Sequence, residues 1–446
     1  MNTVKIIGAG LAGCEAAYQL SKRGVAVDLF EQKPLVYSSA HKLNGFAELV
    51  CSNSLKSLDK YSASGLLKFE LEHFDCLLLK LAKKVSVDAG SALAVDRVAF
   101  SQLVTETVRK LSNLTVYHQT VRKIDCNTPT IIATGPLTEG DLGCQLSSMC
   151  DGFLDFFDAV SPIVEYESID MQYAFKSNRY DKHQGIEQET SDCKGQQLEG
   201  DYINCVLDKQ QYELFYSELI KAERVQQKYW ENIPFFESCM PIEVIASRGL
   251  DTMRFGPMRP VGIIDPKTSR RPYAVLQLRK ENTQGNLYNL VGFQTSLKFG
   301  EQSRVFGLIP ALKNAEYVRY GVMHRNSFIN APKVLNKSFE MKNFPAIFVA
   351  GQLSGVEGYV ESIMSGLIAG INMANRLKDK PKFDLPSTTM CGALTDYLTR
   401  QNDNFSPINA NFGILPPLDI TIKDKKMRKA AMAERALIDL PVLYDA

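Results

Sequence analysis

A glycine-rich turn near the start of the chain limits the possible fold more than any other feature. Residues 4–7 form a short apolar run, residues 8–13 read GAGLAG, and residues 14–22 have the apolar spacing of a helix packed on one face. A second apolar run at residues 25–30 ends in Glu31. A strand, a glycine turn, a helix and a second strand in this order are typical of a parallel βαβ unit. The pattern predicts an α/β protein with a Rossmann-like domain.

The spacing of the glycines, G-x-G-x-x-G, indicates a dinucleotide site rather than merely a tight turn. Gly8 permits the sharp bend, Gly10 lets a pyrophosphate approach the backbone, and Gly13 lets the helix pack closely on the sheet. The phosphates then lie at the amide groups of the helix N-terminus. Glu31 is placed to accept hydrogen bonds from a ribose. The predicted cofactor-binding residues of this unit are Gly8, Ala9, Gly10, Leu11, Ala12, Gly13 and Glu31.

A second glycine cluster lies near the C-terminus, where residues 348–359 read FVAGQLSGVEGY and precede a predicted helix at residues 360–377. Another strand, turn and helix N-terminus is thereby directed at a ligand. An apolar run at residues 131–133 is typical of a strand returning to the same sheet. In the predicted helix, Gly366 and Gly370 continue a stripe of small residues for which close packing is favoured over cofactor contact. The predicted cofactor-binding residues of these segments are Gly135, Gly351, Gln352, Gly358, Tyr359, Glu361 and Ser362.

The length of 446 residues corresponds to about two or three domains. Between the two glycine clusters, residues 160–335 lose the alternation of strand and helix, which indicates an inserted α+β domain. We predict that residues 1–155 and 339–446 together form the dinucleotide-binding domain and that residues 156–338 form the insertion. Within the insertion, residues 183–200 are polar and predict an exposed loop.

The composition excludes several classes of protein. With 51 Lys and Arg against 50 Asp and Glu, any affinity for nucleic acid must come from a local basic patch. Ten cysteines without a C-x-x-C pair and five histidines give neither a zinc-binding spacing nor a disulfide scaffold, so we expect no metal. No apolar stretch approaches 18 residues and no secretory signal is present, so we expect a cytoplasmic protein that does not bind membranes.

A series of further motifs runs along the whole chain. They are FAELVCSNSLKS from Phe46, ALAVDR from Ala92, SPIVEYESIDM from Ser161, DYINC ending at Cys205, CMPIEV from Cys239, RFGPMRPVG from Arg254, YNLVGFQT from Tyr288, YGVMHRN from Tyr320, GQLSGVEGYVES from Gly351 and NANFGILPPL from Asn409. In this order they resemble the TrmFO family, the folate- and flavin-dependent RNA uracil-5-methyltransferases. More distant similarity around residues 351–370 extends to the flavoprotein that modifies wobble uridines.

The resemblance implies a flavoprotein that uses FAD, with 5,10-methylenetetrahydrofolate and NAD(P)H as co-substrates. The folate would provide a methylene carbon to C5 of a uridine in structured RNA, and the reduced flavin would supply the hydride that completes 5-methyluridine. It implies that the inserted domain contacts RNA and folate. We expect no DNA partner, and a monomer or weak homo-oligomer.

The resemblance also implies two catalytic cysteines, Cys51 and Cys239. Uracil C5 becomes nucleophilic only after a thiolate adds at C6, and we assign this step to Cys239, which Pro241 and Glu243 follow. Cys51 would lie nearer the flavin and act as the base at C5 or protect the flavin. Serine and asparagine side chains at residues 52–54 predict an N-cap of a following helix, whose dipole would favour the Cys51 thiolate.

The chain departs from the family pattern where folate or RNA would be met. His41 alone remains of the histidines that usually precede FAELVCSNS, and residues 294–299 read QTSLKF where the family commonly shows a histidine and then a tryptophan after GFQT. Val206 and Leu207 replace Pro-Met, and residues 183–200 resemble an insertion. These departures leave open whether the target is the T-loop of tRNA or large-subunit (23S) rRNA.

Candidate RNA contacts are basic and aromatic. Lysines and arginines would neutralise phosphates, and aromatic rings could stack an extruded uracil. For the basic run at residues 423–429 a solvated helix face is favoured over RNA contact. The other candidates are Lys267, Arg270, Arg271, Arg319, His324, Arg325, Tyr288, Phe293 and Tyr320.

Two other functions remain compatible with the sequence. A flavin oxidoreductase acting on a small molecule would need both glycine clusters but neither Cys51 nor Cys239. A noncatalytic flavoprotein that binds RNA would fit a chain whose departures have disabled folate binding, although the retained cysteines argue against it.

Overall fold

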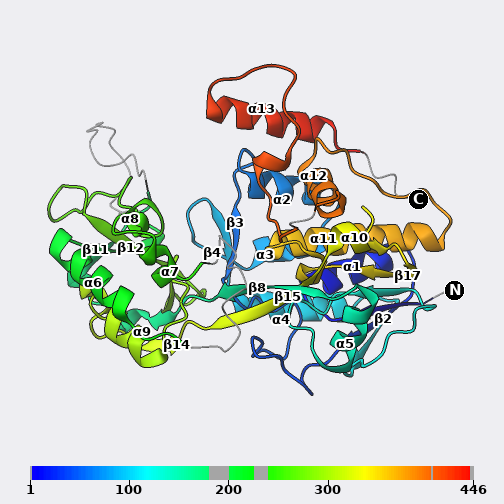
Figure 1. Cartoon of the computed structure of the whole chain (residues 1–446), viewed down its shortest axis with the longest axis horizontal. Helices are drawn as coiled ribbons and strands as arrows, with labels where there is room; N and C mark the ends of the chain where they lie inside the picture. Colours follow the sequence, from blue (N-terminus) through cyan, green and yellow to red (C-terminus); the bar gives the residue numbers. More distant parts are fainter. Residues whose placement is uncertain (1–2, 180–199, 226–239, 403–404, 442–446) are drawn as a thin grey trace, which may run out of the picture.

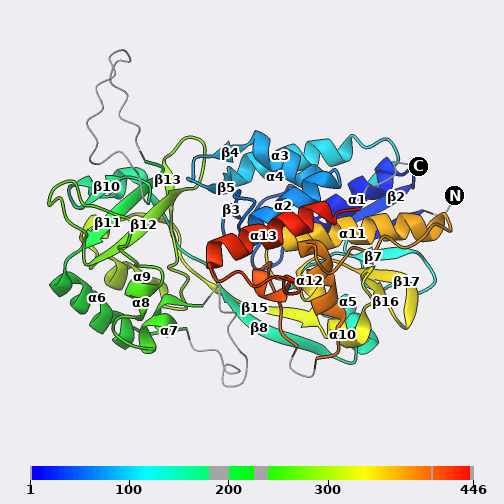
Figure 2. The same cartoon turned by 90° about the horizontal axis from the view of Figure 1, so that it is seen from above.

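A computed structural model describes residues 3–179, 200–225, 240–402 and 405–441 of the chain. Figures 1 and 2 show a larger lobe that contains both ends of the chain and a smaller lobe built from the middle of the sequence. The predicted polar loop at residues 183–200 lies outside the described residues except for Gly200.

A six-stranded sheet forms the centre of the larger lobe, in the order β16-β17-β7-β1-β2-β6. All its pairs are parallel except the pair between β16 and β17. The bounds are β1 Val4–Ile7, β2 Val27–Glu31, β6 Leu114–His118, β7 Thr130–Ile132, β16 Glu340–Met341 and β17 Phe344–Val349. The sheet therefore combines strands from both ends of the chain, and the predicted α/β, Rossmann-like fold is confirmed.

Beside this sheet, helix α1 (Leu11–Lys22) packs against helix α11 (Tyr359–Leu377). A Cβ atom added at Gly366 would lie 2.2 Å from the carbonyl oxygen of Ala12, and one at Gly370 would lie 2.9 Å from that of Ala16. The small residues of α11 thus let the two helix backbones approach closely, as the favoured interpretation of the stripe predicted.

Further helices and a small sheet complete the larger lobe (Figure 1). The helices are α2 Ala63–His73, α3 Leu77–Lys84, α4 Arg97–Arg109, α5 Gly140–Met149, α10 Ala331–Val334, α12 Met390–Thr399 and α13 Lys425–Ile438. The small sheet has the order β3-β5-β4, with β3 Ser54–Ser57, β4 Ser86–Val87 and β5 Ala92–Val95.

The smaller lobe is a second six-stranded sheet, in the order β10-β11-β12-β13-β9-β14, whose pairs are antiparallel. Its strands are β9 Ile163–Glu165, β10 Ala174–Lys176, β11 Tyr202–Leu207, β12 Ala274–Lys280, β13 Leu287–Leu290 and β14 Tyr317–Arg319. The helices of this lobe are α6 Lys209–Lys221, α7 Ile242–Ser247, α8 Thr252–Phe255 and α9 Phe299–Phe306. They bury a separate core around Tyr212, Phe215, Phe293 and Phe306.

A two-stranded antiparallel ribbon joins the lobes (Figure 2). It pairs β8 (Phe153–Ala159) with β15 (Met323–Ile329), so the chain enters and leaves the smaller lobe along neighbouring strands. The domain limits at residues 155 and 338 stay a prediction. Within the described ranges, none of the helices combines the length and apolar composition that crossing a bilayer requires.

Candidate dinucleotide site and the Cys51 loop

A cavity lies at the carboxyl ends of β1, β2 and β7, where ligands bind in open parallel sheets. Both glycine clusters and Cys51 line it, although they are far apart in the sequence. The predicted site residues in its wall are Gly8, Ala9, Gly10, Leu11, Ala12, Glu31, Cys51, Gly135, Gly351, Gln352, Tyr359 and Ser362.

The first glycine turn has the geometry that close approach of a ligand requires. Gly8 has a φ of +100°, and a Cβ there would lie 2.5 Å from the carbonyl oxygen of Ala133. A Cβ at Gly13 would lie 1.9 Å from the oxygen of Gly8, whereas one at Gly10 would meet nothing nearer than 3.9 Å. Gly10 is the N-cap of α1 and provides no side-chain cap, so the amide groups of the first turn stay available to a phosphate.

A second helix N-terminus opens at the same cavity. Gly358, with a φ of +123°, precedes α11 and also provides no side-chain cap. Tyr359 and Ser362 of the first turn line the cavity. Two helix dipoles therefore place partial positive charge at one site.

Glu31 at the end of β2 is nearly buried, with 7% of its surface exposed. Its carboxylate accepts hydrogen bonds from the amides of Ala9 and Lys33, each at 2.9 Å. The carboxylate thus lies against the first glycine turn and within the cavity wall, the position from which a ribose hydroxyl can be bound.

Three predicted cofactor residues do not line the cavity, and one predicted catalytic residue cannot be placed relative to it. Gly13 packs against Gly8, and Gly358 adjoins Glu361 at the start of α11. The carboxylate of Glu361 accepts a hydrogen bond from the amide of Ala410 at 3.0 Å and thereby fixes the NANFGILPPL segment. Cys239 lies outside the described residues.

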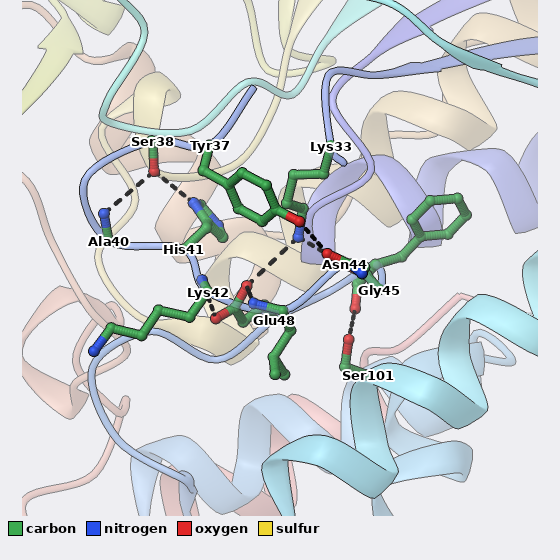
Figure 3. Close-up of polar contacts among 12 residues, drawn as sticks. Lys33, Tyr37, Ser38, Ala40, His41, Lys42, Asn44, Gly45, Glu48 and Ser101 are labelled. Carbon is green, nitrogen blue, oxygen red and sulfur yellow. Dashed lines mark hydrogen bonds and ion pairs between the residues drawn. The ribbon is translucent and has the colours of Figure 1, made fainter. Parts of the chain in front are cut away.

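A polar loop between β2 and β3 contributes residues to the cavity wall, and Figure 3 shows the polar contacts within this loop. Lys33 forms an ion pair with Glu48 at 3.5 Å and donates to the carbonyl oxygen of Gly45 at 2.6 Å. Glu48 accepts from the amides of Lys42 and Leu43. Sequence reasoning missed Lys33 and Glu48, because their opposite charges meet only when the loop folds back.

Two histidines also line the cavity, His41 in this loop and His324 on β15. His41 Nδ1 lies 2.6 Å from the hydroxyl of Ser38. Burial, and then the charge of Lys33, lowers the pKa of His41. Burial lowers the pKa of His324 as well, assisted by Arg319 and His41. Both imidazoles are therefore neutral at neutral pH and can accept or donate a hydrogen bond.

The segment after Cys51 forms a strand, and the predicted helix with its dipole is wrong. Serine hydroxyls at residues 52 and 54 accept from amides two residues further on, and such local bonds compete with a helix. Residues 54–57 then pair with β5. The amides of Cys51 and Ser52 are not at a helix N-terminus. They donate to the hydroxyl of Tyr359 at 2.8 and 2.9 Å.

Two of the three aromatic residues predicted to stack uracil belong to the core of the smaller lobe. Tyr288 is 4% exposed and Phe293 is fully buried, and both pack in the hydrophobic core of that lobe. Tyr320 stacks between Phe299 and Tyr317, with ring centroids 4.9 and 5.0 Å apart. The outer ring of this stack, Phe299, is exposed.

The basic candidates divide by environment. Arg319 is half-buried and donates to the carbonyl oxygens of Val50 and Cys51. Arg325 forms an ion pair with Asp155. Besides Arg325, the candidates with exposed side chains are Lys267, Arg270, Arg271, Lys423, Lys425, Lys426 and Arg428.

Comparisons with known proteins agree with this geometry. A family described as glucose inhibited division protein A matches residues 3–381. A protein of Acetivibrio thermocellus named methylenetetrahydrofolate–tRNA-(uracil-5-)-methyltransferase TrmFO is 50% identical over 436 residues, which cover 97% of each chain. A protein of Dictyoglomus turgidum with the same name is 50% identical over 443 residues, or 99% of this chain and 98% of that protein.

The chain belongs to the TrmFO family. The predicted family membership is thus confirmed. Among solved structures, GidA of Aquifex aeolicus resembles this TrmFO family member with a TM-score of 0.68 and 16% identity, over 99% of this chain and 74% of GidA. At this identity the similarity shows a shared fold alone.

Proposed function

We propose that this protein is an RNA uracil-5-methyltransferase that uses FAD and 5,10-methylenetetrahydrofolate, with tRNA as its substrate. One observation carries the proposal: two helix N-termini, Glu31 and Cys51 meet at a single cavity. The names of the relatives, which specify methylenetetrahydrofolate and tRNA, support the choice of donor and RNA. NAD(P)H is the proposed reductant.

The cavity fits FAD. The uncapped first turns of α1 and α11 offer amide donors to a pyrophosphate, and Gly10 leaves the space that its approach requires. Glu31 would accept from the ribose. When bound and reduced, FAD supplies the hydride that completes the methyl group.

The protein's thiols carry the remaining chemistry in this proposal. Cys239 Sγ forms a bond to C6 of the uracil, and the electron pair moves toward C5, which then attacks the methylene carbon. Cys51, in the cavity wall, takes the proton that C5 releases. The bond between the transferred carbon and the folate nitrogen breaks as this proton leaves, and hydride addition to the resulting methylene group would then expel Sγ from C6 and free the RNA.

Transfer of label from methylene-labelled folate to RNA tests the function. The purified protein is supplied with FAD, NADPH and unmodified transcripts of tRNA and 23S rRNA, and methyluridine is mapped by mass spectrometry. We expect label in tRNA. Label confined to rRNA would show that rRNA, and not tRNA, is the substrate. Flavin reduction without label in either RNA would refute the proposal.

Replacing each thiol separates the two roles. We expect Cys51→Ala and Cys239→Ala to abolish methyl transfer, whereas Cys144→Ala, at an exposed cysteine on α5, retains it. With RNA that contains 5-fluorouridine, a covalent complex should form with Cys51→Ala and not with Cys239→Ala. A complex formed by Cys239→Ala would reverse the assignment.

A further inference from the structure

Three arginines from separate elements converge on the loop around Cys51. Arg97, at the start of α4, donates to the carbonyl oxygen of Leu49 at 3.0 Å. Arg319 on β14 donates to the carbonyl oxygens of Val50 and Cys51 at 3.4 and 3.2 Å. Arg279 on β12 donates from Nε to Asn53 Oδ1 at 3.0 Å and from Nη2 to Ser52 Oγ at 2.7 Å.

Arg279 differs from the other two because its partners in this loop are side chains, one of them on the residue after Cys51. Only 8% of Arg279 is exposed. Arg97 forms an ion pair with Glu281, whereas Arg279 makes no ion pair with any carboxylate in the described part of the chain. A buried guanidinium without a carboxylate is unfavourable. Its hydrogen bonds to Ser52 and Asn53 offset part of the cost of its burial.

Asn53 extends these contacts across the boundary between the lobes. Its side chain is fully buried and donates to the carbonyl oxygen of Val95 on β5 at 3.1 Å and to that of Lys280 on β12 at 3.0 Å. Thr283 of the smaller lobe donates to Asp96 of the larger lobe nearby, from both its amide and its hydroxyl. The seating of the smaller lobe and the conformation of the Cys51 loop therefore share one set of hydrogen bonds.

We propose that Arg279 is a positioning residue for Cys51: by clamping Ser52 and Asn53 it holds the thiol in the cavity wall when the smaller lobe is seated. The inference rests on the proposed function, because it takes Cys51 as a catalytic residue. Because Arg279 belongs to β12, the smaller lobe would help to form a site that lies in the larger lobe.

The test uses the FAD-loaded full chain and compares Arg279→Gln with Arg279→Lys. The lysine variant keeps the positive charge and has one donor group on a shorter side chain. The matched control is Arg304→Gln, a surface arginine of the same lobe that pairs with Glu218 and Glu301. Hydrogen exchange is followed in the peptide that covers residues 49–55, because the amides of Cys51 and Ser52 are hydrogen-bonded there.

We expect exchange in this peptide to accelerate about tenfold in Arg279→Gln, less in Arg279→Lys and not in Arg304→Gln, with α1 unchanged in all three. We expect kcat for methyl transfer to fall about tenfold in Arg279→Gln while KM for RNA stays within about twofold. The combined effect of Asn53→Ala and Arg279→Gln on exchange should be smaller than the product of the two single effects, since the two residues share a hydrogen bond.

Each outcome decides a separate point. Unchanged exchange at residues 49–55 in both Arg279 variants would overturn the clamp. Faster exchange with an unchanged kcat would overturn the positioning role. If the wild-type protein methylates no RNA but the Arg279 variants still show faster exchange, the positioning of the loop by Arg279 would stand and the proposed function would be refuted. If Arg279→Gln does not fold, Arg279→Lys and Asn53→Ala carry the same comparison.

Discussion

At the scale of single residues, the sequence predicted a residue's role where the backbone geometry tolerates only one residue type. The glycines at positions 8 and 13 have almost no room for a Cβ atom, so their spacing carried geometric information. Residues whose role depends on a distant partner could not be read. Arg319 appeared to be a surface cation and instead holds the carbonyl oxygen of Cys51, a residue 268 positions away in the chain.

Replacing Glu31 tests the predicted cofactor site at this scale. Glu31→Ala removes both the proposed ribose acceptor and the acceptor for the amides of Ala9 and Lys33. We expect the Kd for FAD to rise at least about tenfold, which corresponds to about 1.4 kcal/mol, in a titration followed by flavin fluorescence. Glu106→Gln, on the exposed side of α4, serves as the control. Equal affinity of the two variants would contradict the role of Glu31.

At the scale of elements, periodicity predicted the strands and helices of the first βαβ unit to within a few residues. The predicted helix at residues 14–22 begins at Leu11, and the strand at residues 25–30 is Val27–Glu31. The prediction failed after Cys51, because serine and asparagine side chains satisfy either a helix N-cap or a turn leading into a strand. Pairing with β5, 35 to 40 residues further along, decides between them.

The contact between α1 and α11 gives a prediction for element packing. In Gly366→Ala the new methyl carbon would lie 2.2 Å from the backbone of Ala12, so the helices must separate. We expect the free energy of unfolding to fall by about 1–3 kcal/mol, measured by urea denaturation with FAD present. Gly300→Ala, in α9, meets no atom within 4 Å and should change stability little. Equal stability of the two variants would show that α11 can shift without loss.

The start of α12 depends on a buried carboxylate of α2. Glu70 accepts from the amides of Met390 and Cys391 at 2.6 and 2.7 Å, and burial raises its pKa to about 7. Between pH 4.5, the ordinary pKa, and pH 7 the folded state binds more protons at this site than the unfolded state, so this group lowers stability as pH rises. We expect Glu70→Gln to remove that component. Denaturant midpoints from pH 4.5 to 8 will show it, and an unchanged pH dependence would contradict it.

At the scale of the whole molecule, the near balance of 51 basic and 50 acidic residues shows that affinity for RNA must be local. The loss of strand and helix alternation predicted an inserted domain, whereas no sequence pattern predicted how the two lobes pack against each other. That packing depends on single pairs such as Tyr202 with the carbonyl oxygen of Ala89 and Asp201 with the amide of Gly90, which carry no periodic pattern.

Salt dependence identifies the face that meets RNA. We predict that replacing Arg270 and Arg271 by alanine together reduces the slope of log Kd against log salt by about 1–2, since both are exposed on the smaller lobe. Replacing Lys425 and Lys426 on α13 should leave the slope unchanged. Filter binding of tRNA at several salt concentrations measures both. If only the α13 variant shows a smaller slope, the RNA-binding face would have to be assigned to the larger lobe.

The order of strands in the main sheet has a consequence for synthesis of the protein. Strand β7 pairs with β1 on one side and with β17 on the other, and β17 begins at residue 344. On the ribosome, the edge of β7 therefore waits unpaired while the entire smaller lobe is translated, and an unpaired edge invites misassociation. The cofactor site can be completed only after residues 344–377 emerge. The smaller lobe therefore has its whole sequence available to fold before the larger lobe does.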